Sequence, residues 1–77
     1  MSKLEKLLQR IKNNPKTVRF EELDKILRHE GYEPSQPHGG SSHYTYKRVG
    51  SRSLTIPRQI PYVNEYYVRD VLAALGF

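Results

Sequence analysis

The residue types best suited to chemistry lie in one short segment, Gly39-Gly40-Ser41-Ser42-His43, which leads directly into a predicted strand. RNA carries its own nucleophile, the 2′-hydroxyl, so its cleavage mainly needs a group that transfers a proton near neutral pH and cations that stabilise the charged phosphate. Histidine, with a reference pKa of about 6.5, suits the proton transfer. His43 is therefore the candidate general acid or base. The alternative is a surface histidine without a function.

The residues around His43 indicate how a phosphate would be held. Paired glycines allow backbone N–H groups to approach an anion closely, so the backbone of Gly40–Ser42 is a candidate anion cradle. Lys47, two pleats along the same predicted strand, and Arg48 are the candidate cations. The alternative for the glycine segment is a loop that only turns the chain.

Two further histidines, His29 and His38, are candidates for a chemical role. His29 lies at the predicted end of a helix, where a cation interacts favourably with the helix dipole. His38 is either a second proton-transfer group or an exposed loop residue. A zinc ion needs three or four protein ligands, and residues 34–64 contain no carboxylate or thiol to join His38 and His43. We therefore expect no metal site and no cofactor.

The positive charge is concentrated in the middle of the sequence. Thirteen Lys and Arg residues against eight Asp and Glu give a net charge of +5, and residues 34–64 contain no acid at all. Such a segment predicts a positive field that attracts a polyanion, and a nucleic acid is the expected partner. The alternative is a solvated basic hairpin. Two roles remain open for Tyr62, Tyr66 and Tyr67: stacking on bases of a nucleic acid, or packing against the core.

Length and composition restrict the class of protein. A chain of 77 residues, 36% of them hydrophobic, is long enough for one small domain with one core. It has no cysteine, which is typical of a cytoplasmic protein. No apolar run approaches the roughly 18 residues of a membrane span, and the first residues lack a signal-peptide core. We expect a soluble cytoplasmic domain without a membrane partner.

Three segments have the apolar spacing of helices. The first lies within residues 1–16 and ends before Pro15, because proline disfavours helix in the residue before it. The second runs over about residues 21–30 and closes on Gly31. The third begins after Asn64, a good N-cap, and ends at Gly76. The apolar stripes are Leu4, Leu7, Leu8 and Ile11, then Leu23, Ile26 and Leu27, then Val68, Val71, Leu72 and Leu75.

Three segments between the second and third helices are predicted strands. Residues 32–36 form a weak strand whose prolines indicate a sheet edge. Residues 42–48 and 52–56 form a hairpin about the turn 49–51. Their alternation places Tyr44, Tyr46, Leu54 and Ile56 toward the core, and His43, Thr45, Lys47, Ser53 and Thr55 on the opposite face. The predicted fold is α+β, in the order α-α-β-β-β-α, with a three-stranded antiparallel sheet and helices on one face.

Four segments together resemble a known family, the HicA-type toxins, small mRNA-cleaving proteins of bacterial and archaeal toxin–antitoxin pairs. They are helix Phe20–Glu30 with Gly31-Tyr32, the turn Gly40-Ser41-Ser42-His43 running into Tyr44-Thr45-Tyr46, the strand Leu54-Thr55-Ile56-Pro57, and the ending Val68-Arg69-Asp70-Val71-Leu72. The resemblance covers about residues 18–77 of a single domain, with residues 1–16 as an N-terminal helical extension. Many relatives have a basic residue where Gln36-Pro37-His38 precedes the glycines, and one serine where this chain has two.

The resemblance implies a fold similar to a double-stranded-RNA-binding domain and a metal-independent ribonuclease activity. It implies that His43 is the catalytic residue, that mRNA is the substrate, and that a HicB-type antitoxin is the protein partner and covers the active site. Attack by the 2′-hydroxyl would leave a 2′,3′-cyclic or 3′ phosphate and a 5′-hydroxyl.

Two other function classes remain open. One is a non-catalytic RNA-binding module with a double-stranded-RNA-binding-like fold. Such domains grip a duplex with lysines at the start of the last helix, whereas this helix starts Glu65-Tyr66-Tyr67, which disfavours that mode. The other is a protein-interaction domain whose basic face binds an acidic partner.

Overall fold

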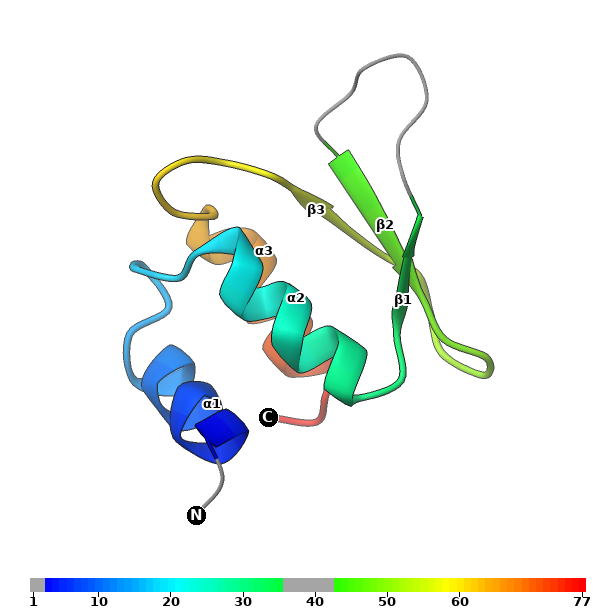
Figure 1. Cartoon of the computed structure of the whole chain (residues 1–77), viewed down its shortest axis with the longest axis horizontal. Helices are drawn as coiled ribbons and strands as arrows, with labels where there is room; N and C mark the ends of the chain where they lie inside the picture. The colour runs from blue at the N-terminus through cyan, green and yellow to red at the C-terminus, as the bar shows by residue number, and fades with distance from the viewer. Residues whose placement is uncertain (1–2, 36–42) are drawn as a thin grey trace.

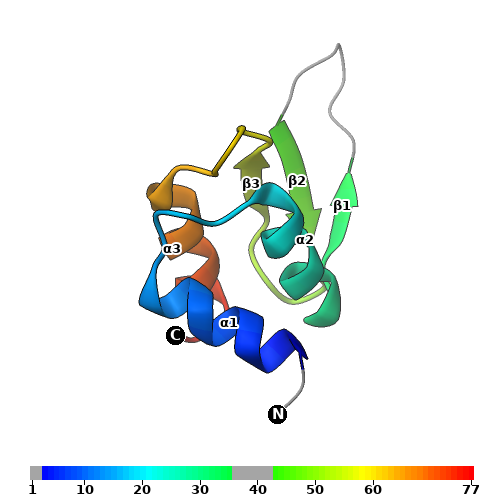
Figure 2. The same cartoon turned by 60° about the vertical axis from the view of Figure 1, so that its left-hand side comes forward.

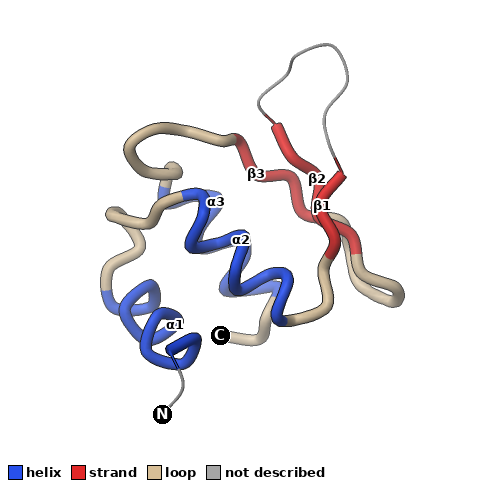
Figure 3. Tube along the Cα trace, viewed as in Figure 1, coloured by secondary structure: helices blue, strands red, loops and turns tan. Residues whose placement is uncertain are grey.

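The computed structural model describes residues 3–35 and 43–77, and their elements follow the predicted order (Figure 1, Figure 3). The predicted α+β class and the order α-α-β-β-β-α are confirmed. The elements are α1 (Lys3–Asn13), α2 (Phe20–His29), β1 (Glu33–Ser35), β2 (His43–Lys47), β3 (Leu54–Pro57) and α3 (Glu65–Ala74).

The three strands form one antiparallel sheet in the order β1-β2-β3, so β2 is central. The hairpin register pairs Tyr44 with Ile56 and Tyr46 with Leu54, as the alternation of apolar residues predicted. The turn between β2 and β3 contains Gly50 at φ +82°, a backbone conformation that favours glycine. Strand β1 is an edge strand, which accommodates the missing N–H of its Pro34.

The helices end where the sequence predicts, and the hydrogen bonds explain why. Gly31 follows α2 at φ +90°, and the N–H of Tyr32 donates to the carbonyl of Leu27 at 2.9 Å. This bond belongs to the helix C-terminus, which is why strand β1 begins one residue later than predicted. At α3, the side chain of Asn64 accepts a 2.9 Å hydrogen bond from the N–H of Tyr66, so the predicted N-cap is confirmed.

Helices α2 and α3 lie on one side of the sheet, and α1 lies beyond them, away from the strands (Figure 1, Figure 2). The first helix is nevertheless joined to the common core, since Ile11 is 0% exposed. The ammonium of Lys12 also lies 4.6 Å from the ring centre of Phe77 at the end of the chain. The fully buried side chains come from every part of the domain: Ile11, Val18, Leu23, Leu27, Tyr32, Tyr46, Leu54, Ile56, Val63, Val68 and Val71.

Tyr46 links the middle of the sheet to helix α2. Tyr46 is 0% exposed, and its hydroxyl donates a 2.6 Å hydrogen bond to Oδ1 of Asp24. Asp24 also accepts from Nε of Arg28 at 2.9 and 3.1 Å. Burial of the phenol, reinforced by the hydrogen bond to the Asp24 carboxylate, raises the pKa of Tyr46 above the usual value of tyrosine.

We predict that Tyr46→Phe lowers the free energy of unfolding at pH 7 by about 1–3 kcal/mol, because it removes a hydrogen bond to a charged group. The raised pKa of Tyr46 also makes stability fall above about pH 10, where the unfolded chain releases this proton and the folded protein still holds it. The loss is about 1.4 kcal/mol per pH unit for one such group. Urea unfolding at pH 7, 10 and 11 measures both effects. Equal pH slopes for wild type and Tyr46→Phe would contradict this account.

Candidate nucleic-acid interface

His43 is the first residue of the central strand, and its side chain is exposed. In the register of the hairpin it lies opposite Pro57, the last residue of β3. Because side chains alternate along a strand, His43 lies on the face opposite to the buried Tyr46 and Leu54. This placement on the face away from the helices agrees with the predicted alternation.

The face of the sheet that carries His43, the outer face, is polar except for Pro57, which lies opposite His43 and is buried. Within the described chain, no helix covers it (Figure 2). Antiparallel sheets commonly have one such solvated face. Hydroxyl and ammonium groups on this face suit hydrogen bonds to phosphate and ribose oxygens. Its residues, placed by the register, are Glu33, Ser35, Thr45, Lys47, Thr55 and Pro57, together with His43.

Lys47 shares the outer face with His43 but not its end of the strand. They are four positions apart, which is about 13 Å along an extended strand. Glu33 lies directly opposite Lys47 on β1, and both are exposed. Opposite charges at paired strand positions attract each other. Glu33 therefore reduces the positive potential around Lys47, at the end of the strand away from His43.

Arg48 is directed to the helical side of the sheet and supports the fold. Its Nη1 donates to the carbonyl of Glu30 at 2.9 Å, at the C-terminus of α2, and its Nε donates to the hydroxyl of Ser51 at 3.0 Å. Its guanidinium also lies 4.5 Å from the ring centre of Tyr32. These contacts cap a helix end and form a cation–π pair. The structure therefore does not bring Arg48 together with His43.

The other two cations of residues 34–64 meet carboxylates from other elements. Nη2 of Arg52 donates to Asp70 of α3 at 2.7 Å, and these hydrogen bonds raise the pKa of the Arg52 guanidinium above its usual value. Nη2 of Arg58 lies 3.7 Å from Oε1 of Glu21 on α2. A segment that is free of acids in the sequence is thus surrounded by acids in the fold, and its positive field is weaker than the sequence alone predicts.

The remaining predicted positions divide into three groups. Gly40, Ser41, Ser42 and His38 lie outside the described residues. His29 is exposed in the last turn of α2, as expected for a cation at a helix C-terminus. Tyr62 and Tyr66 are exposed, and Tyr67 packs partly against the core, its ring 5.3 Å from that of Tyr66.

Arg58 is the cation that sequence reasoning did not single out. It directly follows Pro57, the cross-strand partner of His43, so its backbone lies at the same end of the sheet as His43. Its side chain extends to the helical side and remains 52% exposed. The predicted hairpin register already implied this position of Arg58. A register that pairs residue 44 with residue 56, and residue 46 with residue 54, places residue 58 next to residue 43 at the same end of the hairpin.

Residues 3–35 and 43–77 contain neither a cluster suited to a metal ion nor a helix suited to span a membrane. In this part of the chain, no three His, Cys, Asp or Glu side chains come close enough together to bind a metal ion. In the same residues, no helix has both the length and the apolar character required to cross a bilayer.

Comparison of the chain with protein-family models, with curated proteins and with solved structures finds no match.

We predict that two adjacent cations respond differently to substitution. Arg48→Ala removes a helix-capping hydrogen bond and a cation–π contact and lowers the free energy of unfolding by about 1–3 kcal/mol. Lys47→Ala is the matched control, because it removes the same charge from an exposed position, and it changes stability by less than about 0.5 kcal/mol. Urea unfolding of both variants tests this. Equal losses in the two variants would show that Arg48 has no special structural role.

Proposed function

We propose that this chain is a small metal-independent endoribonuclease of the HicA type, an mRNA interferase, with His43 as its general acid or base. The observation that carries the proposal is the position of His43: exposed, at the start of the central strand, on the outer face of the sheet. The exposed side chain of His43 presents its imidazole on the face across which a phosphodiester group would lie. The sequence resemblance supports the family, and the catalytic role of His43 is supported by that resemblance together with the chemistry of the residues around it.

The strand supports the proposed chemistry by fixing the backbone of His43. The residue is paired with Pro57, and the next side chain, Tyr44, packs partly against the core. A general acid or base must lie within hydrogen-bond reach of the proton that it transfers. An imidazole on a rigid strand meets this geometric requirement better than one on a mobile loop.

The outer face also suits an extended RNA strand. Thr45 and Thr55 pair across β2 and β3 beside His43, and Lys47 lies further along β2. Hydroxyl groups and a lysine position a sugar–phosphate backbone without reading its sequence. Because Glu33 lies opposite Lys47, we expect a moderate electrostatic contribution to affinity. A HicB-type antitoxin, the proposed protein partner, would inhibit the enzyme by covering this face.

We predict that His43→Ala lowers the rate of RNA cleavage by at least about 100-fold, the usual effect of removing a general acid or base. Folding is retained because the side chain is exposed. The assay is cleavage of a single-stranded RNA by purified protein with a chelator present. His29→Ala is the matched control, since it removes an exposed histidine from the end of α2, and it cleaves at the wild-type rate.

Two outcomes would contradict the proposal. Equal cleavage by wild type and His43→Ala would remove His43 from the mechanism and indicate a contaminating nuclease or another residue. RNA binding without cleavage by both proteins would leave the non-catalytic RNA-binding module as the function.

A further inference from the structure

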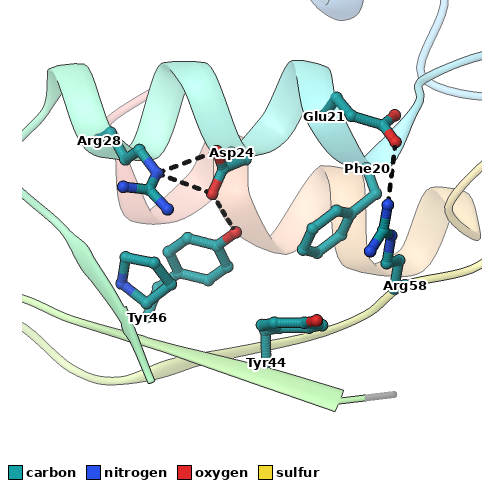
Figure 4. Close-up of a pocket in the computed structure, with 8 residues that line it drawn as sticks. Phe20, Glu21, Asp24, Arg28, Tyr44, Tyr46 and Arg58 are labelled. Carbon is teal, nitrogen blue, oxygen red and sulfur yellow. Dashed lines mark hydrogen bonds and ion pairs between the residues drawn. The ribbon is translucent and has the colours of Figure 1, made fainter. Parts of the chain in front are cut away.

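A groove of about 350 Å³ lies between helix α2 and strand β2, on the helical side of the sheet (Figure 4). This volume falls within the range of small-molecule sites. Figure 4 shows Arg28 and Asp24 at one end of the groove and Glu21 and Arg58 at the other. Phe20 and Tyr44 lie between these two charged pairs.

Tyr44 is the partly exposed aromatic residue of the groove and offers a surface for stacking, whereas Phe20 is only 9% exposed. The rings of Phe20 and Tyr44 are 5.1 Å apart at an angle of 46°, so they do not stack on each other face to face. The guanidinium of Arg58 lies 5.8 Å from the ring centre of Phe20. Proteins that bind single-stranded RNA use this combination, in which an aromatic ring stacks on a base and an arginine contacts the base or its phosphate.

The two carboxylates of the groove differ in availability. Asp24 is engaged by the hydroxyl of Tyr46 and by Nε of Arg28, and only 25% of its side chain is exposed. Glu21 is 63% exposed, and its ion pair with Arg58 is long, at 3.7 Å. An ionised carboxylate only accepts hydrogen bonds. Glu21 therefore favours a ligand that donates N–H groups, while Arg58 beside it favours a neighbouring anion.

The groove adjoins the proposed catalytic end of the sheet. Tyr44 directly follows His43, and Arg58 directly follows the partner of His43 across the hairpin. An RNA strand that crosses this end of the sheet beside His43 would therefore lie next to the groove. The groove and the outer face thus share one end of the hairpin although they lie on opposite sides of it.

We propose that this groove binds one nucleobase of the RNA, and that the base carries an exocyclic amino group. The base stacks on Tyr44 and donates N–H to Glu21, and Arg58 contacts an adjacent phosphate. Adenine, cytosine and guanine meet this requirement, whereas uracil has no amino group. The inference rests on the proposed ribonuclease function and adds a preference for certain bases beside the cleavage site.

The test uses the full chain carrying His43→Ala, so that the RNA stays intact. Dissociation constants are measured at fixed salt for an all-uridine oligonucleotide and for the same oligonucleotide with one central adenosine, cytidine or guanosine. We expect at least one amino-bearing base to tighten binding by about tenfold relative to all-uridine. Adding Glu21→Gln removes that preference, and adding Tyr44→Leu weakens every amino-bearing oligonucleotide by about tenfold.

Two control variants distinguish RNA binding in the groove from general effects of charge or of exposed aromatic rings on RNA binding. Glu30→Gln makes the same charge change at the other end of α2, and Phe77→Leu removes another exposed aromatic ring; both keep the base preference. Thermal melting verifies that Tyr44→Leu is folded. RNA binding that is unaffected by Glu21→Gln and Tyr44→Leu would overturn the base site and leave the ribonuclease proposal standing. Failure of the parent His43→Ala protein and of wild type to bind any RNA would overturn both proposals.

Discussion

The hydrogen bond between Tyr46 and Asp24 is the contact on which the rest of the arrangement depends. A phenol at the centre of a three-stranded sheet can be buried only if its hydroxyl has a partner. Asp24 on α2 provides that partner at 2.6 Å, so the helix is held over the central strand. Once Tyr46 faces the helix, the two-residue alternation of β2 directs His43 and Lys47 to the opposite face. The same bond fixes the wall of the groove beneath α2, so one interaction positions both proposed parts of the RNA site.

Folding redistributes the charge of the basic segment. Three of its arginines contact oxygen atoms of other elements: Arg48 at the end of α2, Arg52 at Asp70 and Arg58 at Glu21. Lys47 has Glu33 as its strand partner. Such exposed pairs contribute little to stability individually, but they reduce the field that would attract a polyanion. In our account the specificity for RNA comes from local groups at one end of the hairpin rather than from a large positive surface.

The sequence was sufficient to predict the elements because each carries its own local signal. The stripe of Leu23 and Ile26, the glycine at position 31 and the cap at Asn64 all depend on neighbouring residues, and all are confirmed. The helical partners of Arg48, Arg52 and Arg58 are Glu30, Asp70 and Glu21. They lie 18 to 37 positions away in sequence, and no local pattern encodes them. Arg48 was therefore placed with His43 in the sequence analysis, while Arg58 was overlooked and the groove was not foreseen.

The proposed account combines a histidine on an open strand face with a base groove on the reverse side of the same hairpin end. We propose that the chain cleaves RNA by attack of the substrate's own 2′-hydroxyl, with His43 transferring the proton. The most direct test compares one RNA oligonucleotide with the same sequence carrying 2′-O-methyl groups. The account predicts cleavage of the unmodified RNA to 5′-hydroxyl products and none of the methylated RNA. Cleavage of both, or of neither, would contradict it.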